Sequence, residues 1–194
     1  MKDKIRNFRI VKKIIVKSNL VMLLLAFIAC YVYLNNSVVL SQTAKSEITT
    51  IILVRHAEKA KSNDNNPNLS EIGQQRAKKL AKTLKNASIN AIYATEFART
   101  QETAKPLSEI INIPIKIIEA NSTDKLVNEI QDKHKGENIL VVGHSNTLPS
   151  IIEKLGNIKI QEINENEYNN LFILNISKND RAKLLSLKYG KESK

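Results

Sequence analysis

The chain has 194 residues with 30 basic and 19 acidic side chains, which gives a formal net charge of +11. This length allows one well-buried domain with an appendage, and it argues against a second full domain. A single cysteine excludes an intrachain disulfide framework. Aromatic residues are few and no zinc-ligand spacing is present, and both observations argue against a role in nucleic-acid binding.

The N-terminal part of the chain predicts attachment to a membrane or export. Residues 1–19 form a basic cytoplasmic region, residues 20–34 an uncharged apolar run, and residues 35–47 a polar linker. The apolar run is shorter than the roughly 20 residues that a spanning helix prefers, so a signal anchor and a cleaved signal peptide are both open. The positive-inside rule then places the remainder of the chain on the extracytoplasmic, periplasmic side of the membrane.

The only cysteine, Cys30, lies near the end of the apolar run. The residues from Phe27 to Cys30 resemble a bacterial lipoprotein signal, in which the cysteine receives a lipid, but phenylalanine stands where leucine is usual. We therefore favour a buried structural cysteine inside an apolar helix, and lipidation stays an alternative.

Residues 48–190 alternate between strand-like and helix-like patterns and are followed by a short tail at 191–194. Short apolar runs predict strands at 48–54, 90–94, 113–119, 138–142, 171–176 and 182–189. Apolar residues at helical spacing predict helices at 70–84, within 95–111, at 123–134 and at 148–155. Pro114 places the third strand near a sheet edge. This order predicts a three-layer α/β/α sandwich with a mostly parallel, mixed central sheet.

Polar side chains follow several of the predicted strands at the point where each strand ends. Arg55 and His56 end the first strand, Arg99 follows the second, and His144 comes directly after the strand at 138–142. Parallel strands place their carboxyl ends at one edge of a sheet, so we expect these four side chains to meet in one pocket. Guanidinium and imidazole groups stabilise the charge on the oxygens of a phosphoryl group during transfer. The pattern therefore predicts a phosphoryl-binding site.

Four segments in this order resemble the motifs of the histidine phosphatase superfamily, branch 1, a phosphoglycerate mutase-like group. They are Leu53–Glu58, with Ala57 where the family usually has glycine, and the segments 68–77, 95–104 and 141–145. The likeness covers about residues 48–190 and is strongest to the small bacterial phosphohistidine phosphatases.

The resemblance implies roles for the clustered residues. His56 would be the nucleophile that forms a phosphohistidine, and Arg55, Arg99 and protonated His144 would hold the phosphoryl oxygens. Glu119 is the preferred match for the general acid, with Asp124 as a weaker rival. No metal or cofactor is required.

Three further residues are predicted to bind substrate: Glu58, Asn68 and Ser145. Glu58 follows the His56 motif closely, so we expect its carboxylate to stay ionised and to orient a histidine or an arginine. Ser145 can cap the next helix or contact phosphate. His134 lies between two lysines at a helix end, and we expect it to be solvated.

The resulting hypothesis is a membrane-anchored or exported phosphatase that acts on phosphorylated small molecules or phosphoproteins. The catalytic part has little room for a large cap, and an open pocket favours hydrolysis over mutase chemistry because a mutase must keep water from its intermediate. Two alternatives differ in class. One is a noncatalytic phosphate-binding protein with the same fold, and the other is a basic module that binds anionic lipid through its N-terminus.

Overall fold

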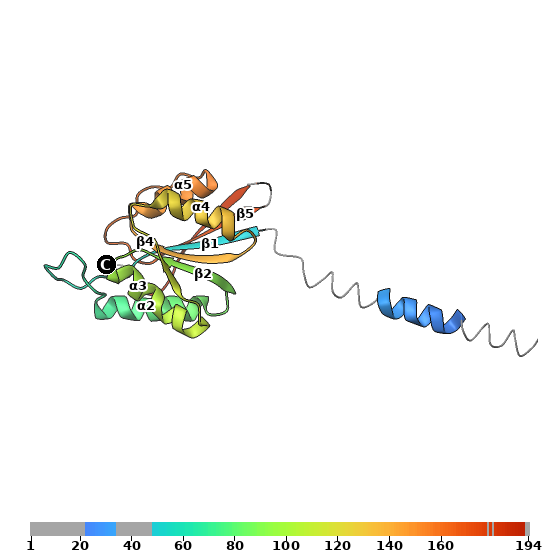
Figure 1. Cartoon of the computed structure of the whole chain (residues 1–194). Helices are drawn as coiled ribbons and strands as arrows, with labels where there is room; N and C mark the ends of the chain where they lie inside the picture. The colour runs from blue at the N-terminus through green and yellow to red at the C-terminus, as the bar shows by residue number, and fades with distance from the viewer. Residues whose placement is uncertain (1–21, 34–47, 178, 180, 193–194) are drawn as a thin grey trace, which may run out of the picture. The chain divides into compact units, whose positions relative to one another are not determined.

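The computed structural model describes residues 22–33, 48–177, 179 and 181–192. The chain divides into two units, residues 1–45 and 46–194, and each is described by itself. In the first unit, residues 22–33 form a helix (Figure 1). Cys30 lies in this helix and is exposed, so the expectation of a buried cysteine is wrong. None of the helices that the structure describes is both long enough and apolar enough to cross a membrane. The predicted basic region at 1–19 and linker at 35–47 lie outside the described residues.

The second unit contains one mixed six-stranded sheet with the strand order β3-β2-β4-β1-β5-β6 (Figure 1). The first four strands in this order are mutually parallel, whereas β5 and β6 are antiparallel to their neighbours. The strands are β1 (Ile48–Arg55), β2 (Ile89–Ala94), β3 (Ile115–Ile117), β4 (Asn138–Gly143), β5 (Asn170–Ser177) and β6 (Ala182–Lys188). The predicted mostly parallel, mixed sheet is confirmed.

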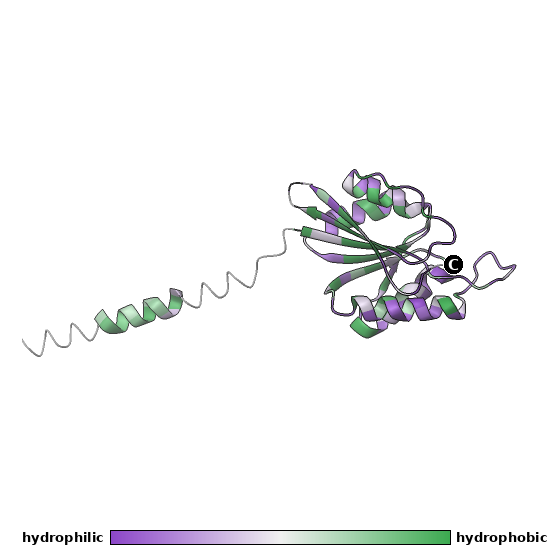
Figure 2. Ribbon diagram, turned by 180° about the vertical axis from the view of Figure 1, so that it is seen from behind, coloured by the Kyte–Doolittle hydropathy of each residue, from purple (hydrophilic) through white to green (hydrophobic). Residues whose placement is uncertain are grey.

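Helices cover both faces of the sheet and complete the predicted three layers. Side chains of α2 (Glu71–Leu84) and α3 (Ala98–Ile111) belong to one hydrophobic cluster, and those of α4 (Thr123–Lys133) and α5 (Thr147–Gly156) belong to the other. Figure 2 shows the hydrophobic residues concentrated along the strands between these helix layers. The α/β sandwich therefore has two cores, one on each face of the sheet.

The central strand β1 shows why a continuous apolar run was a reliable signal. Successive strand residues point to opposite faces, so Ile51 and Leu53 join one core and Ile52 and Val54 join the other. All four side chains are at most 4% exposed. A strand buried on both faces needs apolar residues at every position, and it must end where polar residues begin.

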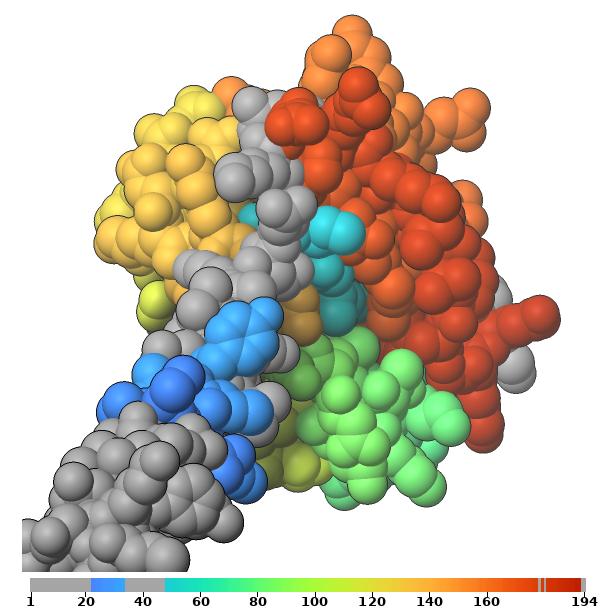
Figure 3. All heavy atoms as spheres, turned by 90° about the vertical axis from the view of Figure 1, so that its right-hand side faces the viewer, coloured from blue at the N-terminus to red at the C-terminus, as the bar shows by residue number. Residues whose placement is uncertain are grey.

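The two edges of the sheet differ from its centre. β3 is only three residues long, shorter than the predicted 113–119, because Pro114 has no N–H to donate and the chain turns at Glu119, whose carbonyl accepts a hydrogen bond from the Ser122 N–H. β6 forms the other edge, and Figure 3 shows the C-terminal strands in red along one exposed side of this unit. The prediction that the third strand lies at an edge is confirmed.

The start of α2 is packed directly on the chain that follows β1. The Ser70 hydroxyl caps the helix by accepting a hydrogen bond from the Gly73 N–H at 3.1 Å, and it donates to the Glu58 carbonyl at 3.2 Å. A Cβ atom at Gly73 would overlap the Glu58 carbonyl oxygen. Glycine at this position therefore permits the close approach that fixes the segment next to His56.

We expect Gly73→Ala to lower the free energy of unfolding by about 2 kcal/mol, because the added methyl group must push α2 away from Glu58. Thermal unfolding followed by circular dichroism measures this change. Ile72→Ala is the matched control, since Ile72 is the neighbouring residue in α2 and is 61% exposed. Similar unfolding temperatures for the two variants would contradict the close packing.

Candidate active site

The structure brings together the four residues expected to form the phosphoryl site. Arg55 is the last residue of β1 and pairs in register with Gly143 of β4, so the following residues, His56 and His144, leave the sheet side by side. Their ring centroids are 5.4 Å apart. Arg99 is the second residue of α3, which follows β2. All four line an open pocket of about 540 Å³.

His56 is held in the form that a nucleophile needs. The residue is 4% exposed, and its Nδ1 lies 2.8 Å from the Ala57 carbonyl oxygen. A carbonyl can only accept, so Nδ1 carries the proton and Nε2 keeps its lone pair. Burial lowers the pKa of His56 to about 3, against the opposing hydrogen bond to Ala57, and the nearby charges of Arg55 and Arg99 lower it further. The imidazole is therefore neutral at physiological pH.

A chain of hydroxyl groups sets the orientation of His144. Its Nε2 lies 3.0 Å from Thr95 Oγ1, which in turn lies 2.9 Å from Thr100 Oγ1. Thr100 donates its single hydroxyl proton to the Phe97 carbonyl at 2.7 Å. Thr95 must then donate to Thr100, and the His144 Nε2–H donates to Thr95.

The protonation state of His144 in the free site differs from the expectation. Burial lowers the pKa of His144 to about 4, and the positive charge of Arg99 acts in the same direction. The predicted imidazolium is therefore not the form of the free protein. An anion bound between His144 and Arg99 would raise this pKa and favour a second ring proton.

These lowered pKa values make the stability of the fold depend on pH. The pKa of His56 is 6.5 when unperturbed and about 3 in the fold, so between these values the unfolded chain binds more protons. The free energy of unfolding therefore falls as the pH drops below 6.5, by about 2 kcal/mol at pH 5 from His56 alone. We expect His56→Asn to flatten the decline of the unfolding temperature between pH 8 and pH 5. An equally steep decline in the variant would contradict this account.

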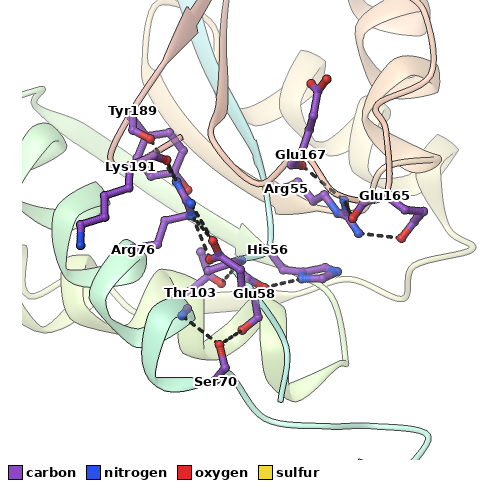
Figure 4. Close-up of polar contacts among 12 residues, drawn as sticks. Arg55, His56, Glu58, Ser70, Arg76, Thr103, Glu165, Glu167, Tyr189 and Lys191 are labelled. Carbon is purple, nitrogen blue, oxygen red and sulfur yellow. Dashed lines mark hydrogen bonds and ion pairs between the residues drawn. The ribbon is translucent and has the colours of Figure 1, made fainter. Parts of the chain in front are cut away.

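Arg55 is anchored by the segment that precedes β5. Its Nη1 donates to the carbonyl oxygens of Asn164 and Glu165 at 3.0 and 2.7 Å, and its Nη2 lies 2.7 Å from Glu165 Oε2 (Figure 4). The guanidinium carbon lies 4.3 Å from the centroid of the Tyr168 ring. Its Nε is buried and has no hydrogen-bond partner within the described part of the chain. Arg55 is thus fixed in position by its two terminal nitrogens.

Glu165 is a pocket residue that the sequence reasoning missed. Its carboxylate accepts hydrogen bonds from Ser145 Oγ and Arg55, and these contacts lower the pKa of Glu165. Its side chain is 75% exposed at the mouth of the pocket. No other acidic side chain lines this pocket in the described structure. The polar segment before β5 gave no local signal, because the Arg55 contact spans 110 residues of sequence.

The predicted acid residues do not line the pocket that contains His56. Glu119 is exposed, and it lines a separate cavity of about 20 Å³, although the next two residues of its loop line the phosphoryl pocket. Asp124 forms an ion pair with Lys154 of α5. The role of Glu119 as a proton donor therefore stays a prediction, without support from its placement.

Among the three additional substrate-binding candidates, only Ser145 lines the pocket. Glu58 instead forms a bidentate ion pair with Arg76 of α2, at 2.6 to 3.0 Å (Figure 4). The expectation that Glu58 orients an arginine holds, but this arginine lies outside the pocket. Asn68 is exposed, and its carbonyl accepts a hydrogen bond from the Ala60 N–H. The prediction that Glu58 and Asn68 contact the substrate is therefore corrected, because neither residue lines the pocket.

The expectation for His134 is also wrong. Its side chain is buried at the end of α4, between the Tyr93 hydroxyl at 2.8 Å and a Glu137 oxygen at 2.7 Å. The flanking lysines pointed to solvent, but the contact with Tyr93 of β2 turns the imidazole inward. In the described residues, no group of three or more His, Cys, Asp or Glu side chains is arranged to hold a metal ion.

Comparisons with known proteins agree with this fold and with the motifs. The family model of the histidine phosphatase superfamily (branch 1) matches residues 51–120. The structure of the protein histidine phosphatase SixA with tungstate has a TM-score of 0.59 at 14% identity, covering 72% of this chain and 96% of that one. A mycobacterial glucosyl-3-phosphoglycerate phosphatase has a TM-score of 0.61 at 10% identity, covering 74% and 100%.

A further solved structure, of a candidate alpha-ribazole-5'-P phosphatase from Escherichia coli, has a TM-score of 0.57 at 16% identity and covers 72% of this chain and 96% of that one. Among curated proteins, none matches this sequence significantly. The matched segment contains residues 51–55 of β1, ending in Arg55, and also His56 and Arg99, whereas His144 lies outside it. Over residues 51–120 the chain therefore resembles the histidine phosphatase superfamily, branch 1, and its fold is shared with the solved phosphatase structures.

Proposed function

We propose that the protein is a metal-independent phosphatase that hydrolyses phosphomonoesters or phosphohistidine through a covalent phosphohistidine on His56. The observation that carries this proposal is the neutral, buried imidazole of His56, whose Nδ1–H is fixed by the Ala57 carbonyl and whose Nε2 is unprotonated. Arg99 lines the same pocket and supplies donors for an incoming phosphoryl group, and His144 becomes a donor once the bound anion favours its second ring proton.

The reaction has two steps. In the first, the Nε2 lone pair attacks phosphorus, the bond between phosphorus and the leaving group breaks, and the leaving atom keeps the electron pair. A basic leaving atom takes a proton from water, whereas a carboxylate leaves as the anion. In the second, a water oxygen attacks phosphorus, the phosphorus–nitrogen bond breaks, and its electron pair returns to Nε2 while water loses a proton to the medium or to phosphate. The positive charges of Arg55, Arg99 and protonated His144 stabilise the negative oxygens in both steps.

The structure favours substrates that need little help from an acid. Glu165 is the carboxylate at the pocket, and contacts with Ser145 and Arg55 lower its pKa, which keeps it ionised rather than able to give a proton. Phosphohistidine and acyl phosphates have good leaving groups and do not need a strong acid. The SixA relative is described as a protein histidine phosphatase, which supports phosphohistidine among the candidate substrates.

Two other functions are compatible with the fold. A mutase has to shield its phosphohistidine from water, and the open pocket with exposed Glu165 at its mouth argues against that chemistry. A noncatalytic phosphate-binding protein would need the cationic groups, but it would have no use for a neutral histidine of fixed tautomer. Hydrolysis is therefore the preferred function.

The test is phosphate release from p-nitrophenyl phosphate and acetyl phosphate in the presence of EDTA. We expect turnover of both substrates, and faster turnover of acetyl phosphate because its leaving group needs no proton. Binding of inorganic phosphate without any turnover, at high protein concentration, would favour the noncatalytic alternative. Activity that disappears in EDTA and returns with a divalent cation would contradict the metal-independent mechanism.

We further propose that the segment at 20–34 attaches the protein to a membrane, with residues 48–190 on the extracytoplasmic side. The support is the run of basic residues followed by an uncharged apolar stretch. The full chain is expected to sediment with membranes after a carbonate wash, whereas residues 46–194 alone stay in the supernatant. Equal behaviour of the two proteins would contradict membrane attachment.

A further inference from the structure

A second hollow lies beside the phosphoryl pocket. It has a volume of about 470 Å³, and its lining includes Lys59, Lys61, Asp64, Arg99 and Tyr168. Lys59 and Arg99 line both spaces, so the two hollows adjoin each other at these side chains. A group attached to a phosphoryl in the first pocket can therefore extend into the second.

The loop at 59–69 lines this hollow and is held in place by hydrogen bonds to α3. The Asn66 side-chain oxygen accepts a hydrogen bond from the Ala98 N–H at 2.9 Å, at the start of α3. The Leu69 N–H donates to a Glu102 carboxylate oxygen of the same helix at 2.7 Å. These two contacts hold the loop at 59–69 against the helix that carries Arg99. The lysines of the loop are thus kept next to the phosphoryl pocket.

The charge of the hollow is predominantly positive. Lys59, Lys61 and Arg99 line it together with one acid, Asp64, whose carboxylate accepts the Asn66 N–H at 2.9 Å. Neither lysine forms an ion pair with any residue that the structure describes, although Lys59 is close enough to Glu165 to contribute to its lowered pKa. The cations therefore keep most of their capacity to attract an anion.

The residues that line the phosphoryl pocket but not the second hollow include no lysine. Among them are the neutral residues Ala120, Asn121, Asn146 and Thr147 and the acid Glu165. A second negative charge on the leaving group therefore gains attraction from Lys59 and Lys61. The rings of Tyr168 and Pro67 line the same hollow and offer apolar surface to the carbon chain between the two anionic groups.

We infer that this hollow binds a second anionic group, a carboxylate or a phosphate, on the leaving-group side of a small phosphomonoester. The inference rests on the proposed phosphatase function, because it places the reacting phosphoryl beside His56 and Arg99. It narrows the substrate class to compounds with two separated negative groups. Lys61 is the best test of the subsite, because it lines this hollow and not the phosphoryl pocket.

Three linear substrates that differ in one group provide the test with the full chain. Sorbitol 6-phosphate has a single anionic group, 6-phosphogluconate adds a carboxylate, and sorbitol 1,6-bisphosphate adds a phosphate. We expect kcat/KM to be about tenfold higher for the doubly anionic compounds, and the ratio to fall about fivefold in Lys61→Gln. Raising the ionic strength should reduce the ratio as well. The arm with the larger ratio identifies the preferred anion.

Lys82→Gln is the matched control, because Lys82 is an exposed lysine in the last turn of α2 and lines neither hollow. It should keep the ratio of the unaltered chain. A ratio near one in the unaltered protein, or an equal ratio in Lys61→Gln and the unaltered protein, would overturn the subsite while leaving the phosphatase proposal intact.

The phosphatase proposal itself is tested by acetyl phosphate. If none of the three sugar compounds is hydrolysed, calorimetric binding of the same compounds decides on the subsite. Tighter binding of the doubly anionic compounds that is lost in Lys61→Gln would support the anion subsite by itself. Equal affinity for all three compounds would overturn it.

Discussion

Replacing His56 with alanine is expected to reduce phosphate release by at least about 10⁴-fold, because the variant lacks the atom that accepts the phosphoryl group. The structure explains why the loss of activity depends on this one residue. His56 Nδ1 is occupied by the Ala57 carbonyl, so the ring offers a single nucleophilic atom, Nε2. The remaining donors, Arg55, Arg99 and His144, can bind phosphate without forming a covalent bond.

Two measurements check this prediction. Steady-state phosphate release gives the loss of rate, and rapid acid-free quenching followed by mass spectrometry detects a phosphoryl adduct on the unaltered chain but not on His56→Ala. Inorganic phosphate should still bind to the variant. His134→Gln is the control, since it removes a buried histidine that lies outside the pocket and bonds to Tyr93 and Glu137. An adduct that persists in His56→Ala would move the nucleophile to another residue.

Replacing Glu58 with alanine is expected to lower the free energy of unfolding by about 3 kcal/mol and the unfolding temperature by about 10 °C. Arg76 is only 3% exposed and donates to both oxygens of the Glu58 carboxylate. Without Glu58, this buried guanidinium keeps only the carbonyl oxygens of Tyr189 and Lys191, at 3.2 and 3.0 Å (Figure 4). The remaining charge is then uncompensated.

Chemical denaturation and thermal unfolding measure this loss, and the double variant Glu58→Ala/Arg76→Met should recover part of it because it removes the unpaired charge. The single variant Glu58→Ala also tests the corrected role of Glu58. Below its unfolding transition, Glu58→Ala should keep a KM close to that of the unaltered chain. A large rise in KM with unchanged stability would restore Glu58 as a substrate-binding residue.

The sheet and its helices were predictable because each element carries a local signal. β1 is buried on both faces, so its apolar run and its abrupt end at Arg55 and His56 follow from burial alone. The convergence of Arg55, Arg99 and His144 follows from one topological rule, that parallel strands end at the same edge. Because this rule needs only the order of the strands, the meeting of Arg55, Arg99 and His144 could be predicted from the sequence.

The residues that the sequence did not reveal depend on contacts between distant segments. Glu165 reaches Arg55 across 110 residues, from a polar segment with no periodicity. Glu58 was assigned to the pocket because it follows His56 closely, but its partner Arg76 lies 18 residues further along on α2. His134 has charged neighbours in sequence and a buried tyrosine as its neighbour in space. Local composition does not report on such pairings.

Because β5 pairs antiparallel with β1, changes in the segment before β5 are separated from changes in the strands that carry the catalytic histidines. Val54 near the end of β1 lies opposite Leu171 near the start of β5, so the segment at 157–169 reaches the pocket from outside the parallel core. Its side chains can change while the ends of β1 and β4 keep His56 and His144 in place, as long as the carbonyl oxygens of Asn164 and Glu165 still hold Arg55. Grafting a different segment between α5 and β5 should therefore redirect which compounds are accepted without rebuilding the catalytic histidines, which makes this connection the natural place to engineer new selectivity.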